Sequence, residues 1–248
     1  MMKCKNINEV IDKLNLIVED CKKRQDPLGY FAVLYRKVTI RVKQGIQRNE
    51  FEDNQRMENL DVVFANRYFD AYELYQNKQI CTQAWQTAFD AKNESGHIIL
   101  QHILLGINAH INLDLGVAAL DACNQQPIHY IQKDFIAINA VLSELVDDVK
   151  KNMGAMSPVY KWLMPLVKKT DEMLINFSIK IARDGAWDFA TALSQNQRSE
   201  PCIHERDETV AMLGRKLRNP GTRLSWVLKA ISLAEWRSVA SNLAIMEK

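Results

Sequence analysis

Three of the protein's five histidines lie in one short, otherwise apolar stretch, residues 96–114. They are His97, His102 and His110, and Asp114 follows His110 by four residues. Imidazole is the commonest metal ligand and the usual acid–base group near neutral pH. This stretch is therefore the first candidate for a functional site.

Helical geometry decides which of these side chains could cooperate, because a helix turns by roughly 100° and rises by about 1.5 Å per residue. Asp114 lies one turn beyond His110, so the two can address one point in space. His102 shares the apolar face of His110 but lies about 12 Å away along the axis. The two histidines could share an ion only if the helix were broken or kinked, for example near Gly106, which we expect to leave room beside the backbone. Otherwise His102 would serve a second ion, a haem-like group or a substrate. The opposite face is expected to be polar, with His97, Gln101, Asn108 and Asn112.

A second candidate is Asp61, in a helix expected over residues 57–76. It shares a face with Phe64, Tyr68 and Tyr72, whereas Asn66 is expected on the other, polar face. A carboxylate in an aromatic stripe is costly unless it is paired, protonated or bound to a metal. Asp61 is therefore predicted as a ligand or a general base. The alternative is a hydrogen bond to a tyrosine or a helix cap.

The leading hypothesis is a metal-dependent enzyme, first of all a hydrolase acting on a small molecule. A divalent ion, zinc or iron, would be held by His110, Asp114, His102 and Asp61, and would activate water or dioxygen. Asp61 and His102 are also the predicted catalytic residues.

Two other functions stay open. In the first, the tyrosine stripe and Gly106 shape a pocket in a non-enzymatic helical module, which binds a hydrophobic small molecule or a protein partner. In the second, the polar core residues only enforce one packing of the helices.

Composition narrows the class of protein. The chain has 248 residues, 47% of them hydrophobic and 25% charged, which is ordinary for a globular protein. A net charge of +2 gives no general attraction to nucleic acid or to an anionic membrane. The basic cluster at 215–223 is nearly cancelled by acidic neighbours at 205–208. We therefore expect no nucleic-acid partner.

The sequence also bears on the cellular location of the protein and on the state of its cysteines. The sequence has no run of about 20 apolar residues, so we expect no membrane span. A charged amino terminus makes a cytoplasmic location the default. The five cysteines are scattered and never spaced as CxxC, which argues against a disulfide framework and a zinc knuckle. The sequence also lacks the Walker, GxGxxG, GxSxG and HExxH motifs.

Helical periodicity dominates the chain, and we predict an all-α fold: a single multi-helix, bundle-like domain over residues 1–248. Asp26 to Gly29 should end the first helix and separate it from the second. Ser95 is the expected N-cap of the histidine-rich helix. A polar loop is expected at 194–208, and an apolar helical region from residue 157. Helices are expected at about 6–22, 30–48, 57–76, 79–92, 129–151, 183–193 and 224–246.

Residues 26–35, 51–53, 56–58, 60–68 and 102–114 resemble an uncharacterised bacterial all-helical family, most clearly in the motif HxLLGINAHINxDL. The resemblance covers most of the chain and implies a complete domain of bacterial type, but no activity. The chain is also similar to zinc-dependent phospholipases C and P1-type nucleases, which are all-helical and use His-x-x-x-Asp ligands. It lacks their amino-terminal tryptophan and their full ligand order.

Overall fold

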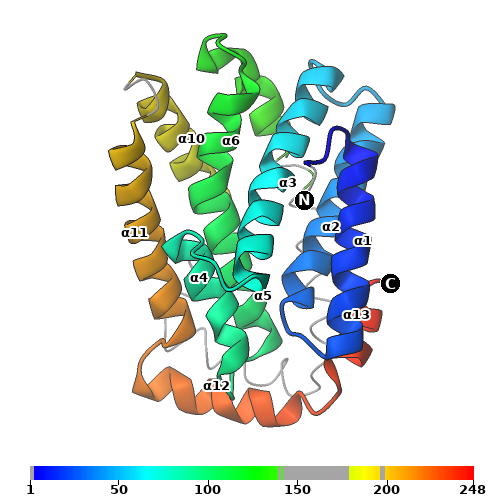
Figure 1. The fold of residues 1–248 in the computed structure, drawn as a ribbon, viewed down its shortest axis with the longest axis vertical. Helices are drawn as coiled ribbons and strands as arrows, with labels where there is room; N and C mark the ends of the chain where they lie inside the picture. Colours follow the sequence, from blue (N-terminus) through cyan, green and yellow to red (C-terminus); the bar gives the residue numbers. More distant parts are fainter. Residues whose placement is uncertain (1–2, 139–140, 142–178, 196–198) are drawn as a thin grey trace.

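The computed structural model describes residues 3–138, 141, 179–195 and 199–248. Within these ranges it contains ten α-helices and no strand, which confirms the predicted all-α fold. Most of the helices stand side by side in a bundle (Figure 1). The predicted helix at 129–151 falls mostly outside the described residues, and the apolar region expected from residue 157 falls largely outside them.

The helices are α1 (Ile7–Arg24), α2 (Gly29–Gln47), α3 (Asn54–Gln76), α4 (Gln83–Asp90), α5 (Ile99–Ala109), α6 (Leu115–Ala122), α10 (Ile179–Gln195), α11 (Glu200–Arg218), α12 (Thr222–Ala234) and α13 (Val239–Met246). The structure also has two short 3-10 helices, η1 (Ala91–Asn93) and η3 (Ile128–Ile131), and one π-helical turn, η2 (His110–Asp114). The predicted break between the first two helices is confirmed, since Asp26 Oδ1 accepts a hydrogen bond from the Leu28 amide at 3.0 Å.

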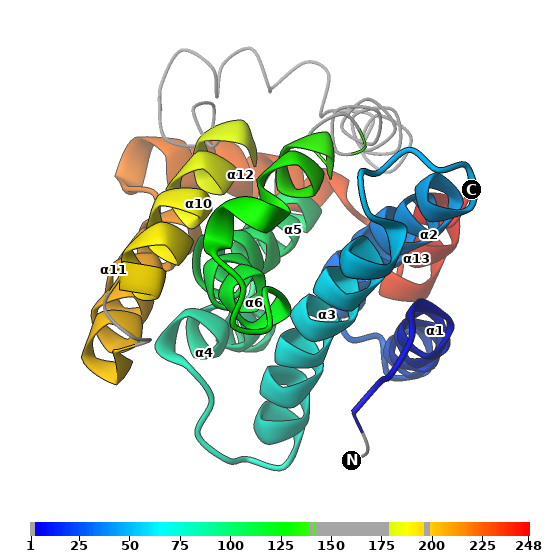
Figure 2. The same cartoon turned by 90° about the horizontal axis from the view of Figure 1, so that it is seen from above.

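The histidine-rich segment is the central helix of the bundle. Helix α5, the turn η2 and helix α6 continue one another from Ile99 to Ala122, and α2, α3, α4, α10 and α11 pack around them (Figure 2). By length and apolarity this helix could cross a membrane, but 89% of its apolar window is buried inside the protein. It therefore forms the core.

The predicted cap of the central helix is wrong. The helix begins after Ile98, not at Ser95, and the Ile98 amide donates to Gln101 Oε1 at 3.1 Å. The Ile99 amide donates to Glu235 Oε2 at 2.9 Å. A residue 136 positions away thus caps the helix, which no local pattern could indicate.

Two further predictions near the carboxyl end are wrong. Most of the polar segment 194–208 is not a loop but the first part of α11, which begins with a proline in its first turn. Asp207 is buried there and accepts hydrogen bonds from the Gln83 and Ala84 amides at 2.8 and 2.9 Å, capping α4.

The single helix expected at 224–246 is instead α12 and α13, because the chain turns before Ser238, which caps α13.

Gly106 does not leave open room beside the helix. A Cβ added there would lie 2.4 Å from Cγ of Phe31, so the Phe31 ring already fills the space. We expect Gly106→Ala to lower the free energy of unfolding by about 1–3 kcal/mol, measured by urea denaturation, because a packed core does not absorb an extra carbon.

The matched control is Gly185→Ala in α10. Among the residues that the structure describes, its Cβ would meet only the end of the Arg206 side chain, at 3.4 Å. We expect this substitution to be neutral or to stabilise the helix by up to about 1 kcal/mol. Equal effects at the two glycines would contradict the tight contact with Phe31.

Candidate functional site

The candidate site centres on the His110–Asp114 pair in the π-helical turn η2. There the Leu115 amide donates to the carbonyl of His110, five residues earlier. His110 Nδ1 lies 3.2 Å from Asp114 Oδ2, and the two residues are only 2% and 1% exposed. The predicted pairing is therefore present, in a helix distortion that often accompanies functional sites.

Asp114 also receives two N–H donors from other helices. Arg67 Nε in α3 donates to Oδ1 at 2.9 Å, and Trp85 Nε1 in α4 donates to Oδ2 at 2.7 Å. Burial alone would raise the pKa of Asp114, but the charge of Arg67 and the hydrogen bonds from His110 and Trp85 hold it below its ordinary value. Asp114 is thus an ionised carboxylate at neutral pH.

This carboxylate fixes the tautomer of His110. Burial lowers the pKa of His110, against the opposing effect of Asp114, so the imidazole is neutral at pH 7. An ionised carboxylate only accepts hydrogen bonds, so Nδ1 carries the proton and donates it to Asp114. Nε2 is left as a buried acceptor with no hydrogen-bond partner among the described residues.

Aromatic rings enclose His110. Phe64 stacks on the imidazole, with ring centroids 3.5 Å apart and an interplanar angle of 4°. Tyr35 lies edge-on at 4.6 Å. The whole aromatic cage consists of Phe31, Tyr35, Phe64, Tyr68 and Trp85, each with its centroid within 6.0 Å of that of His110.

Asp61 borders this cage, one helical turn before Phe64. It is buried as predicted, and burial raises its pKa to about 7, with a further contribution from Glu58. Burial also raises the pKa of Tyr35, and the negative charges of Asp61 and then Asp114 add to that effect. Asp61 Oδ2 and the Tyr35 hydroxyl, like His110 Nε2, are buried without a hydrogen-bond partner in the described part of the chain.

His102 does not belong to this group. Its ring lies near Tyr30 and His97, with centroids 6.1 and 5.9 Å away. Burial, followed by the charge of His97, lowers its pKa to about 3. The structure therefore places two of the predicted site residues together, puts Asp61 at the edge of their cage, and separates His102 from them.

The four predicted ligands are not gathered at one point, since His102 lies apart from the other three. Over residues 3–138, 141, 179–195 and 199–248, no three His, Cys, Asp or Glu side chains gather closely enough to hold an ion. Both oxygens of Asp114 already accept N–H donors, one of them from the Arg67 guanidinium. A cation at Asp114 would have to compete with that fixed positive charge.

Sequence analysis singled out neither Trp85 nor Tyr35 as a site residue, because a buried aromatic side chain is most often an ordinary core residue. It offers Arg67 only as a weaker candidate, because such residues are common on the polar face of a helix. The expected polar face of the histidine helix is also wrong. Gln101 and Asn108 are buried against α11 and donate to the carbonyls of Leu217 and Val210, both at 3.0 Å.

Asn112 continues this buried row, since its Nδ2 donates to Asn108 Oδ1 at 3.0 Å. The polar face of α3 is likewise partly covered, because Asn66 is buried and exchanges hydrogen bonds of 2.9 Å with the backbone of Cys4. Amides are tolerated in a core when backbone groups satisfy them.

Comparison with known proteins identifies the family but no activity. The model of a family of unknown function, DUF5995, matches residues 7–220. Neither the curated proteins nor the solved structures contain a match, and nothing found supports the similarity to phospholipases C or P1-type nucleases. Because the match spans most of the 248 residues, the chain belongs to DUF5995, a family of unknown function.

Proposed function

We propose that the protein is a helical module that binds a small, neutral molecule carrying a hydrogen-bond donor. One observation carries the proposal: Nε2 of His110 is a buried acceptor without a hydrogen-bond partner among the described residues. An unsatisfied buried polar group costs about 1–3 kcal/mol. A bound molecule that donates to Nε2 would remove this cost.

The surroundings define what such a molecule would look like. Burial keeps the imidazole neutral, and a charged ligand would lose its hydration on entering the aromatic cage. The Tyr35 hydroxyl and the Asp61 carboxyl could supply a donor or acceptor beside His110. Asp61 is about half protonated near pH 7. A compact molecule with an apolar body and one or two polar groups suits this setting.

The test is a nitrogen NMR measurement on protein labelled with ¹⁵N-histidine and screened against a fragment library. We expect fragments that bind to shift the Nε2 resonance of His110 and to leave that of His204, an exposed histidine on α11, in place. His110→Asn removes the Nε2 acceptor and should abolish binding. His102→Asn, at a half-buried histidine outside the cage, is the control and should bind as the wild type does.

Two results would overturn the proposal. In the first, no compound from the fragment library or from a solvent extract of the purified protein shifts the Nε2 resonance of His110. In the second, binding survives His110→Asn unchanged.

The metal-dependent hydrolase is the competing proposal, and one observation favours it. His110 Nε2 and Asp61 Oδ2 are nitrogen and oxygen donors of the kind that zinc and iron accept, and neither has a hydrogen-bond partner in the described ranges. Mass-spectrometric metal analysis of protein purified without chelator separates the two proposals. About one equivalent of zinc or iron, lost in His110→Ala, would favour the hydrolase.

A further inference from the structure

Helix α12 lies across one end of the bundle (Figure 1) and exposes large apolar side chains. Trp226, Leu233 and the following Trp236 are 75%, 78% and 75% exposed. The opposite side of the helix is buried, since Leu228 and Ile231 pack against Ile98. Apolar groups of this size on one short surface segment mark an interaction site more often than single scattered residues do.

The same end of the chain is strongly basic. Residues 209–248 contain seven arginines and lysines but only two acidic residues, Glu235 and Glu247. Burial raises the pKa of Glu235 to about 7, so its charge is partly suppressed. Glu247 is neutralised by Lys22 at 2.6 Å and Arg36 at 2.9 Å. Basic residues therefore outnumber acidic ones in this segment, and one of them, Arg218, pairs with Glu94 outside it.

The sequence suggested that the acidic residues at 205–208 cancel this positive charge, but in the structure they lie apart from it. They lie in the first half of α11, and Asp207 is buried beneath α4. Arg215 and Lys216 lie about two to three helical turns further along, at the exposed end of α11 that leads into α12. Helix geometry thus separates charges that are close in sequence.

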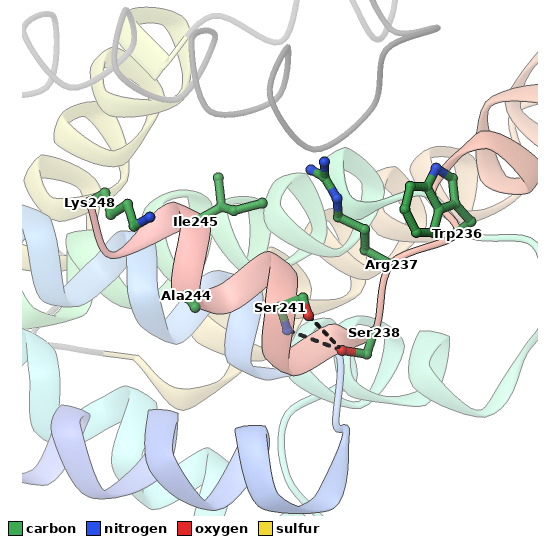
Figure 3. A pocket seen from close by; sticks show the side chains of 7 residues that line it. All are labelled: Trp236, Arg237, Ser238, Ser241, Ala244, Ile245 and Lys248. Carbon is green, nitrogen blue, oxygen red and sulfur yellow. Dashed lines mark hydrogen bonds between the residues drawn. The ribbon is translucent and has the colours of Figure 1, made fainter.

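A shallow hollow of about 530 Å³ is lined by the segment from Trp236 to Ser238 and by one side of α13 up to Lys248. Arg237, Lys248, Ser238 and Ser241 are among its lining residues, and Figure 3 shows Trp236 and Arg237 projecting from the same side of the chain. Cationic side chains and a tryptophan at one hollow suit a lipid phosphate whose acyl chains lie against the indole.

We propose that α12, Trp236 and the adjoining hollow form a docking surface for an anionic lipid membrane. A helix that lies in the membrane interface needs large apolar side chains, tryptophan above all, on its outer side and cations around them. Trp226, Leu233 and Trp236 would enter the headgroup region, and Lys229 would lie among the anionic headgroups. This surface is independent of the His110 site.

The experiment is co-sedimentation of the full-length protein with vesicles, together with its tryptophan emission. One set of vesicles contains phosphatidylcholine alone, and the other an equal mixture with phosphatidylserine. We expect binding to the mixed vesicles, with a shift of the emission to shorter wavelength, and much weaker binding to phosphatidylcholine. Added salt should weaken the binding, because surface charges are screened.

Two variants test the two components. Trp226→Ser, Leu233→Ser and Trp236→Ser together should weaken binding to mixed vesicles by at least about tenfold, since the variant loses the apolar side chains that would enter the membrane. Lys229→Glu should weaken binding by about thirtyfold and reduce its dependence on salt, because the substitution replaces an attractive charge near the anionic surface by a repulsive one.

The matched control replaces two equally exposed apolar residues elsewhere, Leu16→Ser in α1 and Ile80→Ser between α3 and α4, which are 72% and 94% exposed. This variant should bind as the wild type does. Far-ultraviolet circular dichroism checks that every variant is folded.

A wild type that does not bind mixed vesicles, or a triple serine variant that binds them equally well, overturns the proposal. If the wild type instead self-associates in solution and the triple variant does not, the surface is a protein interface and the lipid assignment is wrong.

Discussion

Replacing Asp114 by alanine is expected to lower the free energy of unfolding by about 3–5 kcal/mol, the usual effect of removing one partner from a buried ion pair. Asp114 is almost fully buried, and its oxygens accept hydrogen bonds from Arg67, Trp85 and His110. The substitution would leave the guanidinium and two ring N–H groups without their acceptor inside the protein. Denaturant unfolding monitored by circular dichroism measures the change.

A double-mutant cycle with Arg67→Met separates the ion pair from general damage to the core. The double variant Asp114→Ala/Arg67→Met should be less destabilised than the sum of the single variants, because the second change removes the uncompensated charge. Asp114→Asn should be milder than Asp114→Ala, because it keeps an acceptor oxygen. A loss below about 1 kcal/mol for Asp114→Ala would show that the contacts of this carboxylate contribute little to stability.

In contrast to Asp114→Ala, Asp61→Asn is expected to stabilise the protein. It should raise the free energy of unfolding at pH 8 by up to roughly 4 kcal/mol. The estimate follows from the pKa of Asp61, which burial raises from 3.8 to about 7, a shift of about three pH units at 1.36 kcal/mol each. Asparagine has the same shape as aspartate and carries no charge to bury.

The pH dependence follows from the direction of this shift. Below the unfolded value of 3.8 the carboxyl is protonated in both states, and its contribution to stability is fully present. As the pH rises towards about 7, the unfolded chain ionises first, and this contribution is lost. The wild type should therefore lose stability relative to Asp61→Asn between about pH 4 and 7, and the two should be alike below pH 4.

Asp134→Asn is the matched control, because Asp134 is equally buried but paired. Its oxygens accept hydrogen bonds from the Glu52 amide at 2.7 Å and from Arg56 at 2.6 Å. This substitution should destabilise the protein by about 1.5–3 kcal/mol. If Asp61→Asn also destabilises at pH 8, Asp61 has an ionic partner in the folded protein, and a bound cation becomes the first explanation to test.

These two experiments also bear on function. A carboxyl group that lowers stability at neutral pH is hard to explain as a packing device, and residues of this kind concentrate at functional sites. A stabilised Asp61→Asn that no longer binds the fragments identified through His110 would place Asp61 in the binding site. A stabilised variant that binds normally would restrict the site to His110 and Tyr35.

The sequence determined the features that depend on one helix at a time. Apolar periodicity was sufficient to predict an all-α fold, and the spacing of His110 and Asp114 predicted their contact. The aromatic neighbours of Asp61 at helical intervals predicted its burial. Each of these follows from the fixed angle between successive residues in a helix, so it needs no knowledge of which other helix lies alongside.

Only the tertiary structure decided what each face meets. Arg67 and Trp85 reach Asp114 from 47 and 29 residues away, and Glu235 caps the central helix from 136 residues away. Asn108 points at a backbone carbonyl of α11, so a face that looked solvated is buried. The physical reason is that periodicity records which side of a helix a residue occupies, whereas its partner is set by how distant segments pack. That packing gave the Asp114 carboxylate three N–H donors and placed the imidazole acceptor of His110 beside it.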